Sequence, residues 1–81
     1  MIDTQNEVYA TLRRVAADEN LALGAFDDST TLVDELGFKS LHIARILAIL
    51  EMAFSYDPFA SGEHSITNVR TVGDLCAAYQ R

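Results

Sequence analysis

The stretch over residues 41–54 constrains the fold most strongly, because eleven of its fourteen residues are apolar. Only His42, Arg45 and Glu51 interrupt the run. A helix that is apolar nearly all round is typical of a buried element rather than a surface one. We therefore expect a central core helix that begins at Ser40, where a loop ends.

The length and composition indicate one small globular domain over residues 1–81. Apolar residues make up 49% of the chain, which is enough for one core. The single cysteine, Cys76, excludes an internal disulfide and suits a reducing, cytoplasmic location. The N-terminus is polar, and no apolar run approaches the roughly 20 residues that span a bilayer. We expect no secretion signal and no membrane insertion.

The formal net charge of −6 is concentrated in the first half of the chain. Residues 1–38 contain eight acids and two arginines, whereas four acids and four bases balance over residues 39–81. A chain this acidic repels the phosphates of nucleic acids, which we therefore do not expect as partners. Its charge favours partner proteins that present basic surfaces.

Apolar periodicity predicts three main helices. The first covers residues 4–19 and begins with a capping-box spacing at Thr4. The second covers residues 40–54. The third begins at Thr71, which has a capping spacing to Asp74.

A long connection, about residues 20–38, joins the first two helices. We expect four of its apolar residues to pack on the core and hold the connection in place: Leu32, Val33, Leu36 and Phe38. A short helical turn is expected from Val33 to Leu36. Residues 65–69 predict one further short turn of helix. No segment alternates as a strand does, so the expected fold is all-α. It is a four-helix bundle, three main helices plus one short helix, with a long loop between the first two.

Neither a metal site nor a catalytic site is indicated. The soft ligands His42, His64 and Cys76 lie at no spacing that is typical of a metal site. Ser40 and His42 are two residues apart and point to different sides of a helix, so the imidazole is badly placed to take the hydroxyl proton. There is no Gly-x-Ser-x-Gly elbow and no glycine loop for phosphate. We expect neither a bound metal nor enzymatic activity.

Two interpretations of Ser40 follow from its position before the apolar run. Serine is a preferred helix N-cap. A helix N-terminus is also where a covalently attached phosphate is best tolerated, because the free N–H groups and the helix dipole both favour an anion. The position alone leaves both interpretations open.

A resemblance to a known family rests on Asp34-Glu35-Leu36-Gly37-Phe38-Lys39-Ser40-Leu41. This segment resembles the Asp/Glu-x-Leu-Gly-x-Asp-Ser-Leu signature of acyl carrier proteins and related carrier domains. The likeness extends over nearly the whole chain, through the first helix, the long loop, the helix after the serine, and the closing segments Ile66-Thr67 and Thr71-Val72-Gly73-Asp74-Leu75.

The resemblance implies that Ser40 is esterified by 4′-phosphopantetheine, which a phosphopantetheinyl transferase donates from coenzyme A. The thiol of this arm would carry an acyl or aminoacyl group as a thioester between enzymes that load and transfer it. Such a protein is a monomeric shuttle and not a catalyst. Apolar residues near Ser40 are candidates for sheltering the cargo, although core packing is the competing role for most of them: Leu36, Phe38, Leu41, Ala44 and Ile66.

The chain departs from the family pattern at Lys39, because the family has Asp just before the serine. The following helix, usually rich in acids, carries His42 and Arg45, with Glu51 as its only acid. Partner docking through Lys39, Leu41, His42 and Arg45 would therefore use a neutral-to-basic surface. We expect a specialised carrier in a lipid, polyketide or nonribosomal pathway. The alternative is an unmodified helical protein-interaction module in which Ser40 is only an N-cap.

Overall fold

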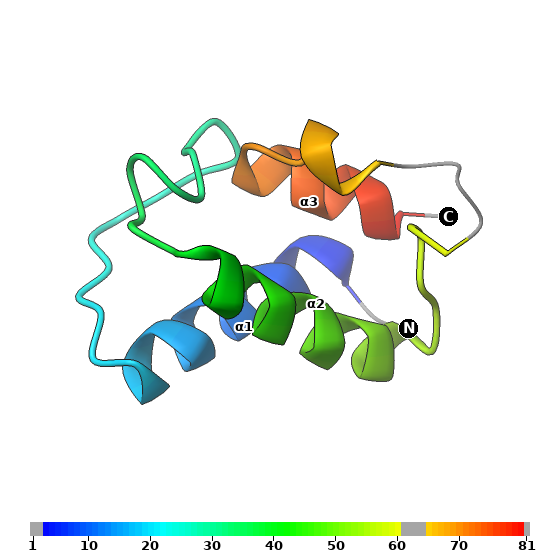
Figure 1. Ribbon diagram of the computed structural model, residues 1–81, viewed down its shortest axis with the longest axis horizontal. Coiled ribbons are helices and arrows are strands. Elements are labelled where there is room, and N and C mark those ends of the chain that lie inside the picture. The colour runs from blue at the N-terminus through cyan, green and yellow to red at the C-terminus, as the bar shows by residue number, and fades with distance from the viewer. Residues whose placement is uncertain (1–2, 61–64, 81) are drawn as a thin grey trace.

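The computed structural model describes residues 3–60 and 65–80. In these ranges the chain forms three α-helices and one turn of 3₁₀ helix: α1 (Thr4–Asp18), α2 (Ser40–Phe54), η1 (Ile66–Asn68) and α3 (Val72–Tyr79). α1 packs against both α2 and α3 (Figure 1). The described residues contain no β-strand, only an isolated bridge between Thr31 and Thr71. The all-α prediction is confirmed, while the expected short helix is a single 3₁₀ turn.

The first helix begins as predicted, but a different residue caps it. Asp3 has the extended backbone of an N-cap, and its carboxylate accepts a hydrogen bond from the Asn6 N–H at 3.2 Å. Thr4 is the first helical residue, so the predicted capping box from Thr4 to Glu7 is wrong. Asp is one of the strongest N-cap residues, and here it lies one position earlier. Four apolar side chains then point into the core at helical spacing: Val8, Leu12, Val15 and Ala16.

The long connection is held to the start of α3 by backbone hydrogen bonds. Leu32 N–H donates to the Arg70 carbonyl at 2.9 Å, and Val72 N–H donates to the Thr30 carbonyl at 2.9 Å. Leu32 is buried in the core, as predicted. These bonds satisfy backbone groups that a long loop would otherwise leave unpaired.

Where a short helical turn from Val33 to Leu36 is predicted, the loop makes hydrogen-bonded turns that do not amount to a helix. One of them joins the Gly37 N–H to the Val33 carbonyl at 3.0 Å, which is the spacing of a single α-turn. Gly37 has φ +79°, a conformation that costs glycine little, and Phe38 beyond it is only 1% exposed. Leu36 is half-buried, whereas Val33 is 55% exposed and does not pin the loop.

The expectation that α2 is buried nearly all round is wrong. Only Ile46 and Leu50 are buried, whereas Leu41 is 81% and Met52 is 83% exposed. α2 packs on α1, and near its end Phe54 stacks on Tyr79 of α3. An apolar composition cannot reveal that a bundle this small has too few neighbours to cover a helix on every side.

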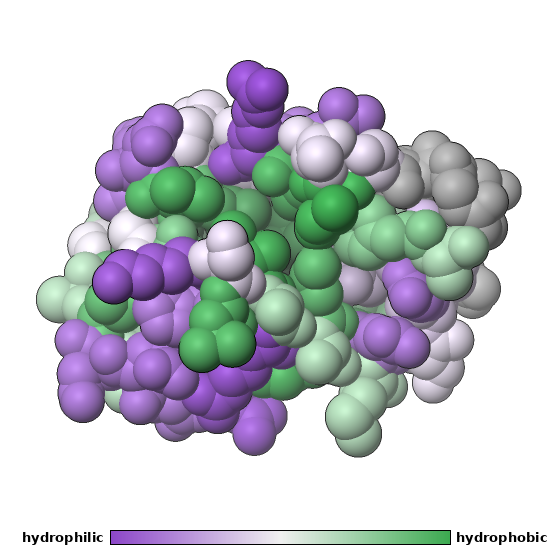
Figure 2. All heavy atoms as spheres, viewed as in Figure 1, coloured by the Kyte–Doolittle hydropathy of each residue, from purple (hydrophilic) through white to green (hydrophobic). Residues whose placement is uncertain are grey.

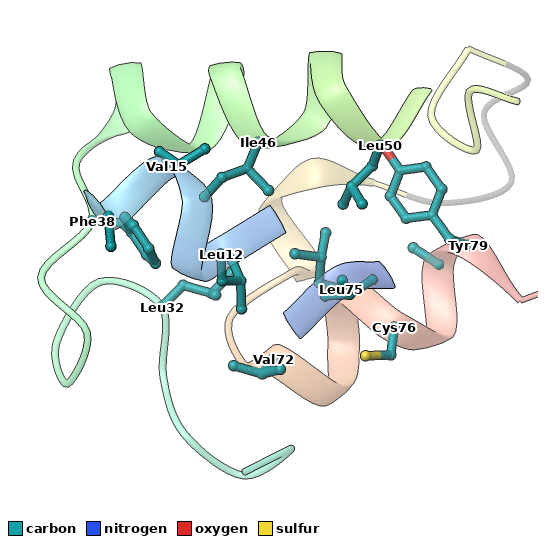
Figure 3. Close-up of a cluster of buried hydrophobic side chains, with 13 residues drawn as sticks. Leu12, Val15, Leu32, Phe38, Ile46, Leu50, Val72, Leu75, Cys76 and Tyr79 are labelled. Carbon is teal, nitrogen blue, oxygen red and sulfur yellow. The ribbon is translucent and has the colours of Figure 1, made fainter. Parts of the chain in front are cut away.

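Three helices and the loop contribute to one core (Figure 3). Leu12 and Val15 of α1, Ile46 of α2 and Leu75 of α3 all belong to this cluster. α3 begins with the predicted capping box, in which the Thr71 hydroxyl accepts from the Asp74 N–H at 3.1 Å and the Asp74 carboxylate accepts from the Thr71 N–H at 3.0 Å. Within the described ranges, no helix is both long and apolar enough to cross a membrane.

Candidate functional site

Ser40 is the first helical residue of α2, and the N-cap position before it is occupied by Lys39. Lys39 has the extended backbone of a cap residue, with φ −98° and ψ 170°. Over residues 3–60 and 65–80, no side chain accepts a capping hydrogen bond from the first turn of α2. The interpretation of Ser40 as the N-cap is therefore wrong, because the cap lies one residue earlier. Ser40 is exposed, and its hydroxyl has no hydrogen-bond partner among the described residues.

His42 ties the start of α2 to the rest of the protein. Its Nδ1 accepts a hydrogen bond from the Lys39 N–H at 3.1 Å. Its ring meets the Phe38 ring edge-on, with the centroids 6.1 Å apart. Its Nε2 lies 3.7 Å from a carboxylate oxygen of Glu19, the C-cap residue that follows α1. With 14% of its side chain exposed, His42 faces inward, and little of it is accessible to a partner.

Arg45, like His42, contacts acidic residues at the end of α1. Its Nη2 lies 2.7 Å from the Asp18 carboxylate, and its Nη1 lies 3.1 Å from that of Glu19. The acids at the end of α1 therefore neutralise the base in the middle of α2. Of the four residues predicted to form a docking surface, Lys39 and Leu41 are exposed, and their side chains make no ion pair or hydrogen bond with the described part of the chain.

An open apolar hollow lies beside Ser40, between α2 and η1 (Figure 2). It has a volume of about 340 Å³ and is lined by Ser40, Ile43, Ala44, Leu47, Ile66, Thr67 and Val69. The volume is within the range of small-ligand sites. A group attached to the Ser40 hydroxyl therefore starts at the rim of an apolar surface.

A second hollow of about 390 Å³ continues along α2. It shares Ala44, Leu47 and Ile66 with the first, and it extends the lining to Ala48, Glu51, Asp57, Phe59 and Tyr79. Because they share these three residues, we treat the two hollows as one, the α2–η1 groove. It runs from Ser40 towards the C-terminal end of α3.

The groove contains two of the predicted pocket residues, Ala44 and Ile66. Leu36 and Phe38 line neither hollow, and Phe38 is part of the core. Ile43 and Leu47 also line the groove, and neither is among the predicted pocket residues. They lie three and seven positions after Ser40, a spacing that places side chains on the same helix face, so a search from Ser40 would have found them.

The ionisable residues that line the groove are Glu51, Asp57 and Tyr79. Burial, together with the charges of Asp57 and Glu51, raises the pKa of Tyr79 to about 12, so its hydroxyl stays protonated. Burial likewise raises the pKa of the Cys76 thiol to about 11, which makes it a poor nucleophile. Within residues 3–60 and 65–80, no three His, Cys, Asp or Glu side chains gather as metal ligands do. His64 lies outside the described residues.

Comparisons with protein-family models, with curated proteins and with solved structures found no match.

Proposed function

We propose that this protein is an acyl or aminoacyl carrier that bears 4′-phosphopantetheine on Ser40. The observation that carries the proposal is the state of the Ser40 hydroxyl. It is exposed, it has no capping role, and it lies on the rim of an apolar groove. The resemblance of residues 34–41 to the carrier signature supports the same function.

The start of α2 fits the phosphate of such an arm. The N–H groups of a first helical turn have no partner within the helix, and here no side chain caps them. Together with the helix dipole, they favour a covalently attached phosphodiester. The Lys39 ammonium, one residue away, contributes a further, weak attraction, since both charges are in solvent. The arm supplies the thiol that carries the cargo; the chain supplies its attachment point and a sheltering surface.

The partners of such a carrier are a phosphopantetheinyl transferase and the enzymes that load and receive the cargo. The protein acts as a cytoplasmic monomer with no catalytic activity of its own. In this proposal the three helices and η1 take the place of the four helices of a carrier bundle. Because α2 presents Lys39 and apolar side chains rather than a row of acids, we assign it to a specialised lipid, polyketide or nonribosomal pathway.

Intact mass spectrometry tests the proposal. The protein is incubated with coenzyme A and a transferase of broad specificity, beside the variants Ser40→Ala and Ser55→Gly. Ser55 lies at the other end of α2 with φ 53°, so glycine suits its backbone and the variant controls for the loss of a serine. Wild type and Ser55→Gly should gain one phosphopantetheinyl group, and Ser40→Ala should gain none. Modification of Ser40→Ala would overturn the assignment of Ser40.

A second candidate function is an unmodified protein-interaction module. The exposure of two large apolar side chains on α2, Leu41 and Met52, favours it. In this second function Ser40 cannot be the N-cap of α2, because Lys39 occupies that position. An absence of any mass gain with several transferases, each active on another carrier, would favour this second function over the first.

A further inference from the structure

The junction between the loop and α2 lacks an ordinary cap. A side-chain oxygen at the N-cap normally accepts a hydrogen bond from the first turn, but the cap residue here is Lys39, which has no acceptor in its side chain. The side-chain hydrogen bond at this junction runs the other way. His42, three residues into the motif, accepts from the Lys39 N–H at 3.1 Å. This is the reciprocal half of a capping box, made by an imidazole instead of a carboxylate.

The hydrogen bond assigns the protonation of the ring. Nδ1 accepts, so in the neutral imidazole the proton is on Nε2. Nε2 faces the Glu19 carboxylate at 3.7 Å, where a proton is favoured. The edge-on contact with Phe38 fixes the plane of the ring. One side chain therefore connects the loop, the start of α2 and the end of α1.

We propose that His42 is the positioning residue of Ser40: its unprotonated Nδ1 fixes the loop–helix junction on which the serine lies. The consequence for modification rests on the carrier function proposed above. The hydrogen bond itself does not, since it exists in the unmodified protein. A second proton on the ring places an N–H where the Lys39 N–H already points, so the bond is lost and the junction opens.

The charged groups around the ring come from both helices. Glu19, just after α1, lies 3.7 Å from Nε2, and Arg45 of α2 is paired with Asp18 and Glu19 in the same cluster. The Lys39 ammonium belongs to the cap residue itself.

Hydrogen exchange of the Lys39 amide tests the proposal on the unmodified, full-length protein. Exchange is measured by NMR between about pH 8 and about pH 5.5, the range in which an imidazole takes up its second proton. Rates are corrected for the intrinsic effect of pH. The ¹⁵N shifts of His42 report the tautomer, and the Leu50 amide, in the core, reports global stability. We expect Lys39 protection to fall roughly fivefold from the alkaline to the acidic end of this range, with Leu50 unchanged.

Two variants separate positioning from packing. In His42→Asn, the side-chain oxygen can accept where Nδ1 does but does not titrate, so protection of Lys39 should persist and become independent of pH. In His42→Leu, which has no acceptor, protection should be low throughout. Should His42→Leu fail to fold, the wild-type titration and His42→Asn decide the matter. A proton on Nδ1 at high pH, or Lys39 protection that ignores the titration, would overturn the proposal.

The rate of modification by the transferase is then compared between wild type and His42→Asn at each pH, which cancels the pH dependence of the enzyme itself. The ratio of wild type to variant should be near one at the alkaline end and should fall roughly fivefold at the acidic end. A constant ratio contradicts the positioning of Ser40 by His42. If neither protein is modified at any pH, the carrier function fails, and the Lys39 exchange still decides the role of His42.

Discussion

The guanidinium of Arg45 on α2 lies 2.7 Å from the Asp18 carboxylate at the end of α1. The neighbouring Glu19 contacts the other terminal nitrogen of Arg45 at 3.1 Å. The positive charge of Arg45, which distinguishes α2 from the acidic helix of the carrier pattern, is therefore paired with acids of the same chain. A partner that approaches α2 meets Lys39 and an apolar surface that includes Leu41.

Replacing Arg45 by alanine should weaken the contact between α1 and α2. Both partners of the pair are partly exposed, so we expect a loss of about 0.5–1 kcal/mol in the free energy of unfolding. Urea denaturation measures it, and the loss should shrink at high salt, which screens exposed charges. Arg14→Ala on the exposed face of α1 is the control. An Arg45 effect no larger than that of Arg14, or one insensitive to salt, would contradict a role for the pair.

The variants Lys39→Asp and Lys39→Gln separate the effect of residue 39 on helix capping from its effect on partner recognition. Aspartate at the N-cap can accept a hydrogen bond from the first turn of α2, so the variant should be more stable by about 1 kcal/mol. Lys39→Gln removes the charge without supplying a good cap and should leave stability nearly unchanged. Thermal unfolding measures the stability of both variants relative to wild type.

The same two variants test the specialised-carrier hypothesis. Lys39→Asp introduces the acid that the carrier signature has before its serine, and it should increase modification by transferases that prefer acidic carriers, by an electrostatic effect on encounter. Lys39→Gln should lie between it and wild type. Unchanged modification rates and unchanged partner choice in both would end the hypothesis.

Ala44 lies where the two hollows of the α2–η1 groove meet, and it is exposed. Ala44→Trp should fill the groove and leave an attached acyl chain in water. We expect the thioester of the variant to hydrolyse severalfold faster than that of wild type, because burial of each methylene contributes about 0.8 kcal/mol. Ala10→Trp, on an exposed position of α1, is the matched control. Equal hydrolysis rates in all three proteins would show that the groove does not shelter the cargo.

The capping box of α3 should make the free energy of unfolding depend on pH in the acidic range. Hydrogen bonds from the backbone N–H groups of Arg70 and Thr71 lower the pKa of Asp74 below its ordinary 3.8. A carboxyl whose folded pKa is depressed stabilises the protein above its unfolded pKa and loses that contribution as pH falls through the folded value. Asp74→Asn should therefore be less stable than wild type at neutral pH, and the difference should narrow below about pH 4. Urea midpoints measured from neutral to strongly acidic pH check this, and a constant difference would contradict it.

The helix positions were predictable from sequence, because each depends on signals within a few residues. The periodicity places α2 over residues 40–54, as observed, and Thr71 with Asp74 makes the predicted cap of α3. The exposure of Leu41 and Met52 was not predictable in the same way. It depends on which elements cover α2, and that is a property of the whole bundle.

The candidate site was predictable only in part. Ser40, Ala44 and Ile66 were found from the resemblance and do lie together around the groove. The pairing of Arg45 with Asp18 joins residues 27 positions apart, and no local pattern indicates it. The same holds for the inward orientation of His42, which depends on the end of α1 lying beside the start of α2.

Peptide mass spectrometry at Ser40 tests the central claim most directly. Trypsin cleaves after Lys39 and Arg45, so it releases residues 40–45, in which Ser40 carries the only hydroxyl. After incubation with coenzyme A and a transferase, this peptide should gain the mass of one phosphopantetheinyl group, and fragmentation should place it on Ser40. An unmodified 40–45 peptide, from a reaction in which another carrier protein is fully converted, would contradict the proposed function.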